Sequence, residues 1–295
     1  MKRISRLVIL SSTLLPMTFS GCLFTHRKLP IPKAPTITQN ATAAQLVESL
    51  NKHWDALQSL NASIDINASQ IKSQKGEATD LVTLRGNILM RKPDMLRVLG
   101  RLSVVGTRAF DLVSDGREFT LWIPKMNRAY KGSSRLRKKS ASQLENIRPG
   151  FFMDALLVRG LEPEDLYTVT SDTLSVEDPT RKHLYAVPEY VLGILRKRPD
   201  SPELTPVRVV HFRRDDLLPY KQEIYDNDGN LETEVTYSNY ADFSGSKYPT
   251  QVTIWRPIEE YQIVLTVNKI TENSPLNDEQ FQMKIPDNIE IKHLE

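Results

Sequence analysis

The chain has 295 residues, of which 40% are hydrophobic and 25% are charged, and its formal net charge is +3 at pH 7. Lys2, Arg3 and Arg6 account for that excess, so the rest of the chain is neutral, which argues against a general nucleic-acid-binding protein. The length suits one large domain or two small ones. No apolar run after residue 21 approaches the ~20 residues that a membrane-spanning helix needs.

The N-terminus has the pattern of an export signal. The basic head precedes a short, mostly apolar run over residues 7–15, and Ser20 and Gly21 then precede Cys22. A basic head, a short apolar stretch and small residues before a cut site are typical of a secretory signal. Cys22 is the single cysteine, whereas an exported protein that used cysteines for stability would carry pairs. The stretch resembles the lipobox of bacterial lipoproteins. This implies a signal peptide over residues 1–21 and a diacylglyceryl group on Cys22; a free buried cysteine is the alternative.

Residues 22–42 are predicted to tether this anchor to a folded body over residues 43–295. Pro30, Pro32 and Pro35 lie among lysine, threonine and asparagine, a composition that favours an extended, semi-flexible chain. Lipid anchoring contributes about 0.8 kcal/mol per buried methylene, and it is stable when more than one chain is attached.

The body starts with a helix and continues as strands. Thr42 can cap a helix over residues 43–60, where apolar side chains recur at helical spacing. From Ala62 to Ser69 the apolar period is two, which indicates a strand. Further strands are predicted over residues 81–90, 95–102, 108–114 and 119–123, with a short one around 129–130 and a turn at Asp115-Gly116. The short connections predict an antiparallel meander.

A basic loop and an apolar helix interrupt the strands. Residues 131–139 form the loop, a helix is predicted over 140–147, and a second, strongly apolar helix over 149–158. The loop cations are either solvated or contact anionic lipid head groups, where each contributes about 1 kcal/mol; they are Arg135, Arg137, Lys138 and Lys139. The apolar helix is either ordinary core or a lid over an apolar cavity, because methionine and phenylalanine repack at low cost. Its large side chains are Phe151, Phe152, Met153, Leu156 and Leu157.

Strands resume in the last third of the chain. They are predicted over residues 183–187, 190–196, 207–213, 221–225, 232–240, 250–256 and 261–270, with a hairpin signal at 226–230. In the last strand one face is predicted to carry Tyr261, Ile263, Leu265 and Val267, and the other Val264, Thr266, Asn268 and Ile270. Strands and helices do not alternate, so a parallel sheet is not expected.

Residues that carry chemistry are dispersed. The five histidines are scattered, with none at metal-ligand spacing, and there is no glycine-rich phosphate loop or nucleophile elbow. The carboxylates at 215–216, 226, 228 and 259–260 fall in predicted turns, where aspartate commonly bonds the backbone. The sequence therefore predicts no catalytic site, no metal and no cofactor.

Several stretches, taken in order, carry a family resemblance: residues 86–97 (GNILMRKPDMLR), 113–116 (VSDG) with 119–122 (FTLW), and 217–225 (LLPYKQEIY) with 234–237 (EVTY). They resemble strands of the LolA/LolB-like superfamily of lipoprotein carriers and receptors. The resemblance implies an α+β fold: an unclosed, strongly curved antiparallel sheet, like half a barrel, with helices covering its concave side. Arg97 matches an arginine that ties the family's lid to its sheet. The implied cavity and lid residues are Arg97, Phe110, Leu121, Phe151, Phe152, Met153, Leu156 and Leu157.

The leading hypothesis is a non-enzymatic, lipid-anchored envelope protein that binds acyl chains of lipids or lipoproteins and helps to move or insert them. The alternative is an envelope sensor or scaffold that binds a protein partner with the same sheet. Leu23, and not an aspartate, follows Cys22. By resemblance this favours the outer membrane, with the body facing the periplasm.

Overall fold

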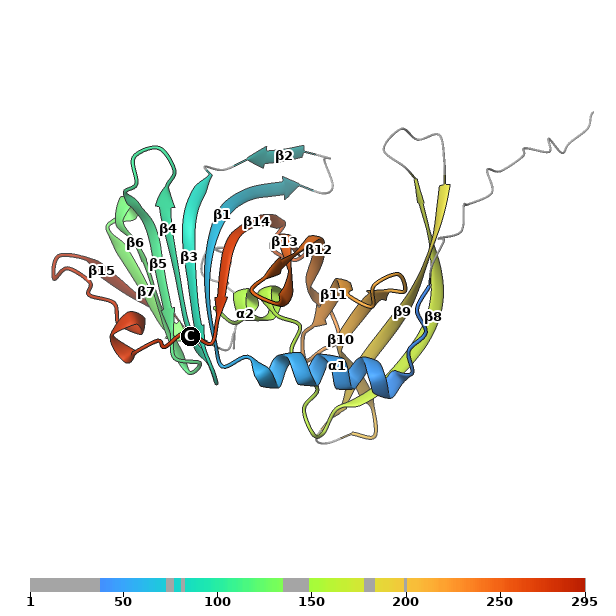
Figure 1. Ribbon diagram of the computed structural model, residues 1–295. Helices are drawn as coiled ribbons and strands as arrows, with labels where there is room; N and C mark the ends of the chain where they lie inside the picture. The colour runs from blue at the N-terminus through green and yellow to red at the C-terminus, as the bar shows by residue number, and fades with distance from the viewer. Residues whose placement is uncertain are drawn as a thin grey trace, which may run out of the picture.

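The computed structural model describes residues 38–72, 77–80, 83–134, 149–177, 184–198 and 201–294. Within these ranges two α-helices accompany a single sheet of 15 strands, which is antiparallel but for one pair of strands and is strongly curved and unclosed (Figure 1). The expected curved antiparallel sheet is thereby confirmed. The signal peptide, Cys22, most of the tether and the helix predicted over 140–147 lie outside the described residues, as do Arg135, Arg137, Lys138 and Lys139.

The first half of the sheet is a meander of consecutive antiparallel strands. It consists of β1 (Ser59–Lys72), β3 (Leu84–Arg91), β4 (Met95–Leu102), β5 (Arg108–Ser114), β6 (Glu118–Ile123) and β7 (Arg128–Ser133). β2 (Glu77–Asp80) pairs with the end of β1, and β15 (Glu290–Leu294) adds parallel to β7. The predicted meander is confirmed.

The second half is a meander in the same sheet. It consists of β8 (Leu166–Glu177), β9 (Leu184–Lys197), β10 (Leu204–Arg213), β11 (Pro219–Tyr225), β12 (Leu231–Phe243), β13 (Ser246–Arg256) and β14 (Tyr261–Glu272). β14 pairs with β1 and joins the halves, so β15 and β8 lie at opposite ends of the sheet (Figure 1).

The structure differs from the predicted elements in one strand boundary and in three additional strands. The two strands predicted on either side of Pro188 are one strand, β9. Pro188 pairs with Thr173 of β8 and lies just past the last β9–β10 pair, at Glu189. β8, β2 and β15 were not predicted. β8 and β2 are exposed along most of their length and so show no buried alternation.

The first helix, α1 (Ala43–Ala56), is shorter than predicted. Its start is a capping box in which Thr42 and Gln45 bond each other's backbone N–H groups, at 2.8 and 3.2 Å. It ends before residue 60 because Asn273 Oδ1 accepts from the backbone of Gln58 at 2.7 Å and draws the chain into β1. Leu60 is buried as a strand residue.

One face assignment in the last strand was wrong. Ile263, Leu265 and Val267 share the buried face as predicted, but Ile270 is buried with them. The β1–β14 register shifts between Ser63 and Ile64, so Asn268 is skipped in the pairing. Such a bulge moves every later side chain to the other face of the strand.

The apolar side chains form two clusters. The larger one combines alternate residues of β1, β3–β6 and β12–β14 with the second helix, α2 (Gly150–Leu156). The smaller one joins Leu46 and Leu50 of α1 to Leu192, Ile194 and Phe212 of β9 and β10. Val158, which follows α2, packs against both clusters.

We expect Gly100→Val to lower the free energy of unfolding by about 1–3 kcal/mol, because overpacking forces neighbours to shift. A Cβ at Gly100 would lie 2.4 Å from Cε1 of Phe110, whose ring covers the glycine. Urea denaturation measures the change. In a Phe110→Ala background the same substitution should cost little; an equal cost in both backgrounds would show that the ring is not the cause.

Candidate functional site

A cavity of about 190 Å³ lies between α1, the end of α2 and strands β10–β13. Most of its lining is aliphatic or aromatic, and the lining residues come from elements far apart in the sequence. The lining residues are Ser49, Leu50, His53, Leu156, Leu157, Val158, Phe212, Leu217, Leu218, Pro219, Tyr237, Tyr240, Lys247, Tyr248 and Pro249.

The tyrosine hydroxyls of the cavity wall are occupied by protein partners. Tyr240 donates to the carbonyl of Pro219 at 2.6 Å, and Tyr248 donates to the carboxylate of Glu272. Tyr237 accepts from Gln222 Nε2 at 2.5 Å. Because each hydroxyl is held in this way, the wall presents mainly ring and aliphatic carbon to the cavity.

The wall is also largely uncharged. Burial lowers the pKa of His53, whose ring lies 5.5 Å from that of Tyr248, and burial raises the pKa values of Tyr240 and Tyr248. All three are therefore neutral at pH 7. Among the lining residues only Lys247 is charged, and it is exposed. The arrangement suits an apolar chain whose polar end lies near solvent.

The predicted site residues are divided by the structure. Leu156 and Leu157 line the cavity, and Phe151, Phe152 and Met153 are buried in the larger cluster. Leu121 also belongs to that cluster and Phe110 packs against it, but neither lines the cavity.

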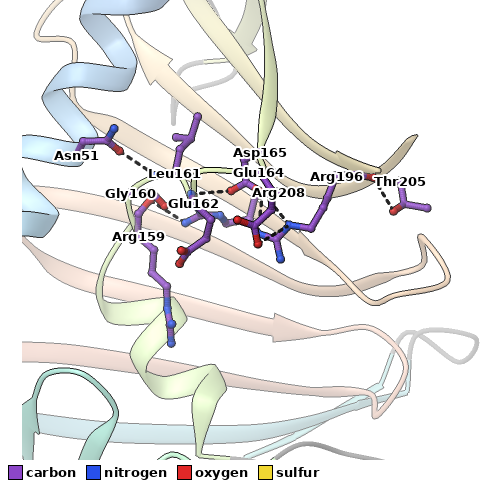
Figure 2. Close-up of polar contacts among 10 residues, drawn as sticks. All are labelled: Asn51, Arg159, Gly160, Leu161, Glu162, Glu164, Asp165, Arg196, Thr205 and Arg208. Carbon is purple, nitrogen blue, oxygen red and sulfur yellow. Dashed lines mark hydrogen bonds and ion pairs between the residues drawn. The ribbon is translucent and has the colours of Figure 1, made fainter. Parts of the chain in front are cut away.

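A polar strap over residues 159–165, which sequence reasoning missed, fixes the chain after α2 (Figure 2). Arg208, which is buried, donates to the carbonyls of Arg159 and Gly160 at 2.9 and 3.0 Å. Asn51 of α1 accepts from the backbone of Leu161 at 2.8 Å. A Cβ at Gly160 would lie 2.8 Å from Asn51 Oδ1, so a glycine permits this close approach.

The far end of the strap is an ion pair. Asp165, whose side chain is 1% exposed, accepts from Arg196 Nη2 at 2.6 Å and from the backbone of Glu162 at 2.9 Å. At the near end Arg159 pairs with Asp154 of α2, and its guanidinium lies 5.6 Å from the ring of Trp54 in α1. The strap therefore binds α2, α1, β9 and β10 together beside the cavity.

Comparison with solved structures identifies the fold. A LolA superfamily protein from Nitrosomonas europaea superposes with a TM-score of 0.51 over 83% of this chain and 99% of its own, at 15% identity.

The chain has the LolA-like fold.

Two further structures match with lower TM-scores. A DUF1329 family protein from Desulfovibrio piger gives 0.49 at 15% identity, covering 81% of this chain and 95% of its own. A proposed outer membrane lipoprotein-sorting domain from Vibrio parahaemolyticus gives 0.47 at 15% identity, covering 81% and 94%. No protein-family model matches the chain, and no curated protein sequence does.

Two other features are absent from the described part of the chain. No group of three or more histidine, cysteine, aspartate or glutamate side chains there could hold a metal ion. No helix in the described ranges is long and apolar enough to cross a membrane.

Arg97 lies on the face of the LolA-like sheet opposite to the buried Leu96 and Val98. Its guanidinium donates to both oxygens of Asp111, at 3.0 and 2.8 Å, and Asp111 is fully buried. It also donates to the carbonyls of Gln280 and Gln282 at 2.9 and 3.3 Å. Arg97 thus holds the C-terminal segment against β4. The role at the lid implied by the family resemblance stays a prediction.

We expect Arg97→Met to lower the free energy of unfolding by about 1–3 kcal/mol, since the buried Asp111 loses its two close hydrogen bonds and keeps only the longer contact from Arg108, at 3.4 Å. Amide exchange over residues 276–282 should accelerate, because two carbonyl contacts are lost. Arg101→Met, on an exposed residue of the same strand, should cost under about 0.5 kcal/mol. Faster exchange in α2 with residues 276–282 unchanged would favour the lid role instead.

Proposed function

We propose that this protein binds acyl chains of lipids or lipoproteins in the cavity beside α2 and passes them on within the cell envelope. The observation that carries the proposal is the neutral, mostly apolar wall of the cavity, whose tyrosine hydroxyls are already bonded to the protein. Burying apolar ligand surface there gains about 25 cal/mol per Å².

The cavity is too small to hold a whole acyl chain as it stands. Ligand pockets commonly measure roughly 300–1,000 Å³, against about 190 Å³ here. Leu156 of α2 lies in the cavity wall, and Phe151, Phe152 and Met153 fill the neighbouring space inside the sheet. We propose that α2 covers the concave side as a lid and yields to the ligand. The strap over 159–165 would then be the fixed end about which α2 moves.

The proposal places the protein at a membrane through its N-terminus. Cys22 would carry the lipid anchor after removal of residues 1–21, residues 22–42 would tether the body, and residues 43–295 would form one lipid-binding domain. Leu23 favours the outer membrane, with the body in the periplasm. The solved relatives named as LolA superfamily and lipoprotein-sorting proteins support an envelope role in general terms.

The turn between β4 and β5 offers a second contact with a membrane. Val104 is 96% exposed and Val105 is 64% exposed, side by side at the tip of this hairpin. Exposed apolar residues at a protruding tip can enter the boundary between lipid head groups and acyl chains. We propose that this tip contacts the bilayer during transfer, with Arg135, Arg137, Lys138 and Lys139 as further basic contacts.

We expect the full chain, made with Cys22→Ser so that it carries no lipid of its own, to retain phospholipid or lipoprotein in native mass spectrometry with lipid extraction. Leu157→Trp should lower lipid affinity about tenfold, or 1.4 kcal/mol, because the indole fills the cavity. Met126→Trp, on a half-exposed residue of the β6–β7 connection, is the matched control. A protein that stays empty after incubation with phospholipid vesicles would overturn the proposal, and the partner-binding alternative would lead.

We expect Val104→Glu to slow transfer of a bound fluorescent phospholipid to vesicles at least about fivefold, because a charge at the tip opposes its entry into the bilayer. Lipid binding itself should be unchanged, since Val104 does not line the cavity. Met126→Glu adds the same charge elsewhere and should transfer lipid normally. Equal transfer by both variants would remove the hairpin tip from the mechanism.

A further inference from the structure

The two ends of the sheet differ in how they are protected. β15, at one end, has 5 residues, EIKHL, three of which are polar or charged, and short charged edges resist pairing with other strands. β8, at the other end, has 12 residues and pairs with β9 along its whole length without a register shift. It contains no lysine, arginine, proline or glycine. Asp172 and Glu177 are the only charged residues among these 12 positions, and no bulge, proline or lysine blocks the edge of β8.

The outer side of β8 is open in the described part of the chain. β9 is its only neighbour in the strand order, and β8 stands at the outer end of the sheet (Figure 1). An unpaired edge presents a row of backbone donors and acceptors to which another strand can add. A strand this long and regular, with its edge unprotected, is a ready-made pairing surface.

Large apolar side chains gather beside this edge. Leu166, Leu174 and Val176 of β8 are 51%, 45% and 40% exposed, and their even spacing places them on one face of the sheet. Tyr185 of β9, which pairs with Val176, is 40% exposed on the same face. An exposed apolar group of this kind marks an interaction surface.

We propose that β8 pairs antiparallel with β8 of a second copy of this chain, with Ser171 on the two-fold axis, so that the two sheets become continuous. For the two sheets to become continuous, the two-fold axis must run perpendicular to them. Each residue then faces a residue of the other copy on the same face of the sheet, and the sequence numbers of the two differ by an even number. With Ser171 opposite itself, the facing pairs on the apolar face are Leu166 with Val176, Thr168 with Leu174, and Thr170 with Asp172.

The side chains favour this register and this occupant. Each exposed leucine or valine faces an apolar or threonine side chain of the other copy, and such pairs stabilise antiparallel strands. Centring the pairing on Asp172 would place two carboxylates opposite each other, which is unfavourable. Centring it on Thr170 would leave Val176 outside the paired strands. A strand that matches itself in this way needs no other partner, and two-fold dimers are the commonest assemblies.

A single engineered thiol tests the register. In the full chain with Cys22→Ser, Ser171→Cys should form a disulfide-linked dimer on mild oxidation, because facing Cα atoms in such a pair lie within disulfide range, about 4.4–6.8 Å. Ser175→Cys lies on the same strand and face, but its two copies would be about 26 Å apart, at ~3.3 Å per residue, and should not cross-link. Equal cross-linking of the two, or none for Ser171→Cys, would overturn the proposal.

Charge substitution tests the association itself. Ser171→Lys sets two lysines opposite each other and should weaken the dimer at least tenfold in sedimentation equilibrium, whereas Ser175→Lys faces Tyr167 and should have little effect. Ser171→Ala removes only the weak contact from Arg214, at 3.5 Å, and should keep the dimer. Thermal unfolding of each variant at low concentration confirms an intact monomer. A Cys22→Ser chain with no other change that remains monomeric at all concentrations, or that pairs only with a different protein, refutes the proposal.

Discussion

The pairing of β1 with β14 is the constraint on which the rest of the structure depends. It is the only strand contact between the two meanders in the described residues, and it runs from Leu60 opposite Glu272 to Gln70 opposite Tyr261. Its buried face carries Ile64, Leu265 and Val267, each worth about 1.5–3 kcal/mol when removed from water. At the end of this pairing, the backbone N–H of Asn273 donates to the carbonyl of Ser59 at 2.8 Å. Asn273 itself has the left-handed backbone conformation. Without the pairing of β1 with β14 the sheet would separate into halves, and the two apolar clusters would no longer be held by one sheet.

The concave side of a curved sheet of this size needs apolar groups from elsewhere to fill it. Side chains on the concave side cannot reach across to meet one another, so other apolar groups must occupy the space. The side chains of α2 pack into the larger apolar cluster, and the cavity lies beside the end of this helix. The polar strap after α2 is tightly bonded, through Arg208, Asn51 and Asp165. The helix itself is held by apolar contacts and, at Asp154, by polar contacts from Arg159 and Gln222. That division permits an exchange of α2 for another apolar group without loss of the attachment point.

Sequence reasoning found what depends on local patterns. The meanders, the turns at 115–116 and 226–230, the apolar helix and the curvature all follow from periodicity, turn residues or family resemblance. It missed β8 because exposure on both faces removes the alternation that signals a strand. It overextended α1 and misplaced Ile270 because Asn273 and the bulge at Asn268 act through long-range pairing. Leu156 and Leu157 were found from composition, but the tyrosine wall at 237–248 comes together only in three dimensions.

The open sheet has a face opposite to the core and two edge strands, β15 and β8, and these surfaces are covered to different extents. On the face opposite to the core, the buried Asp111 is neutralised by Arg97 and Arg108, and the C-terminal segment lies over them. The same segment continues into β15 and ends that side of the sheet with a short, charged strand. The C-terminal residues thus cover part of one face of the sheet and also form one of its edges. No described segment covers the edge at β8, so its outer backbone groups and its apolar side chains are both exposed there. Because closing a sheet into a barrel would remove both edges, a sheet that stays open keeps its far edge, at β8, available for pairing.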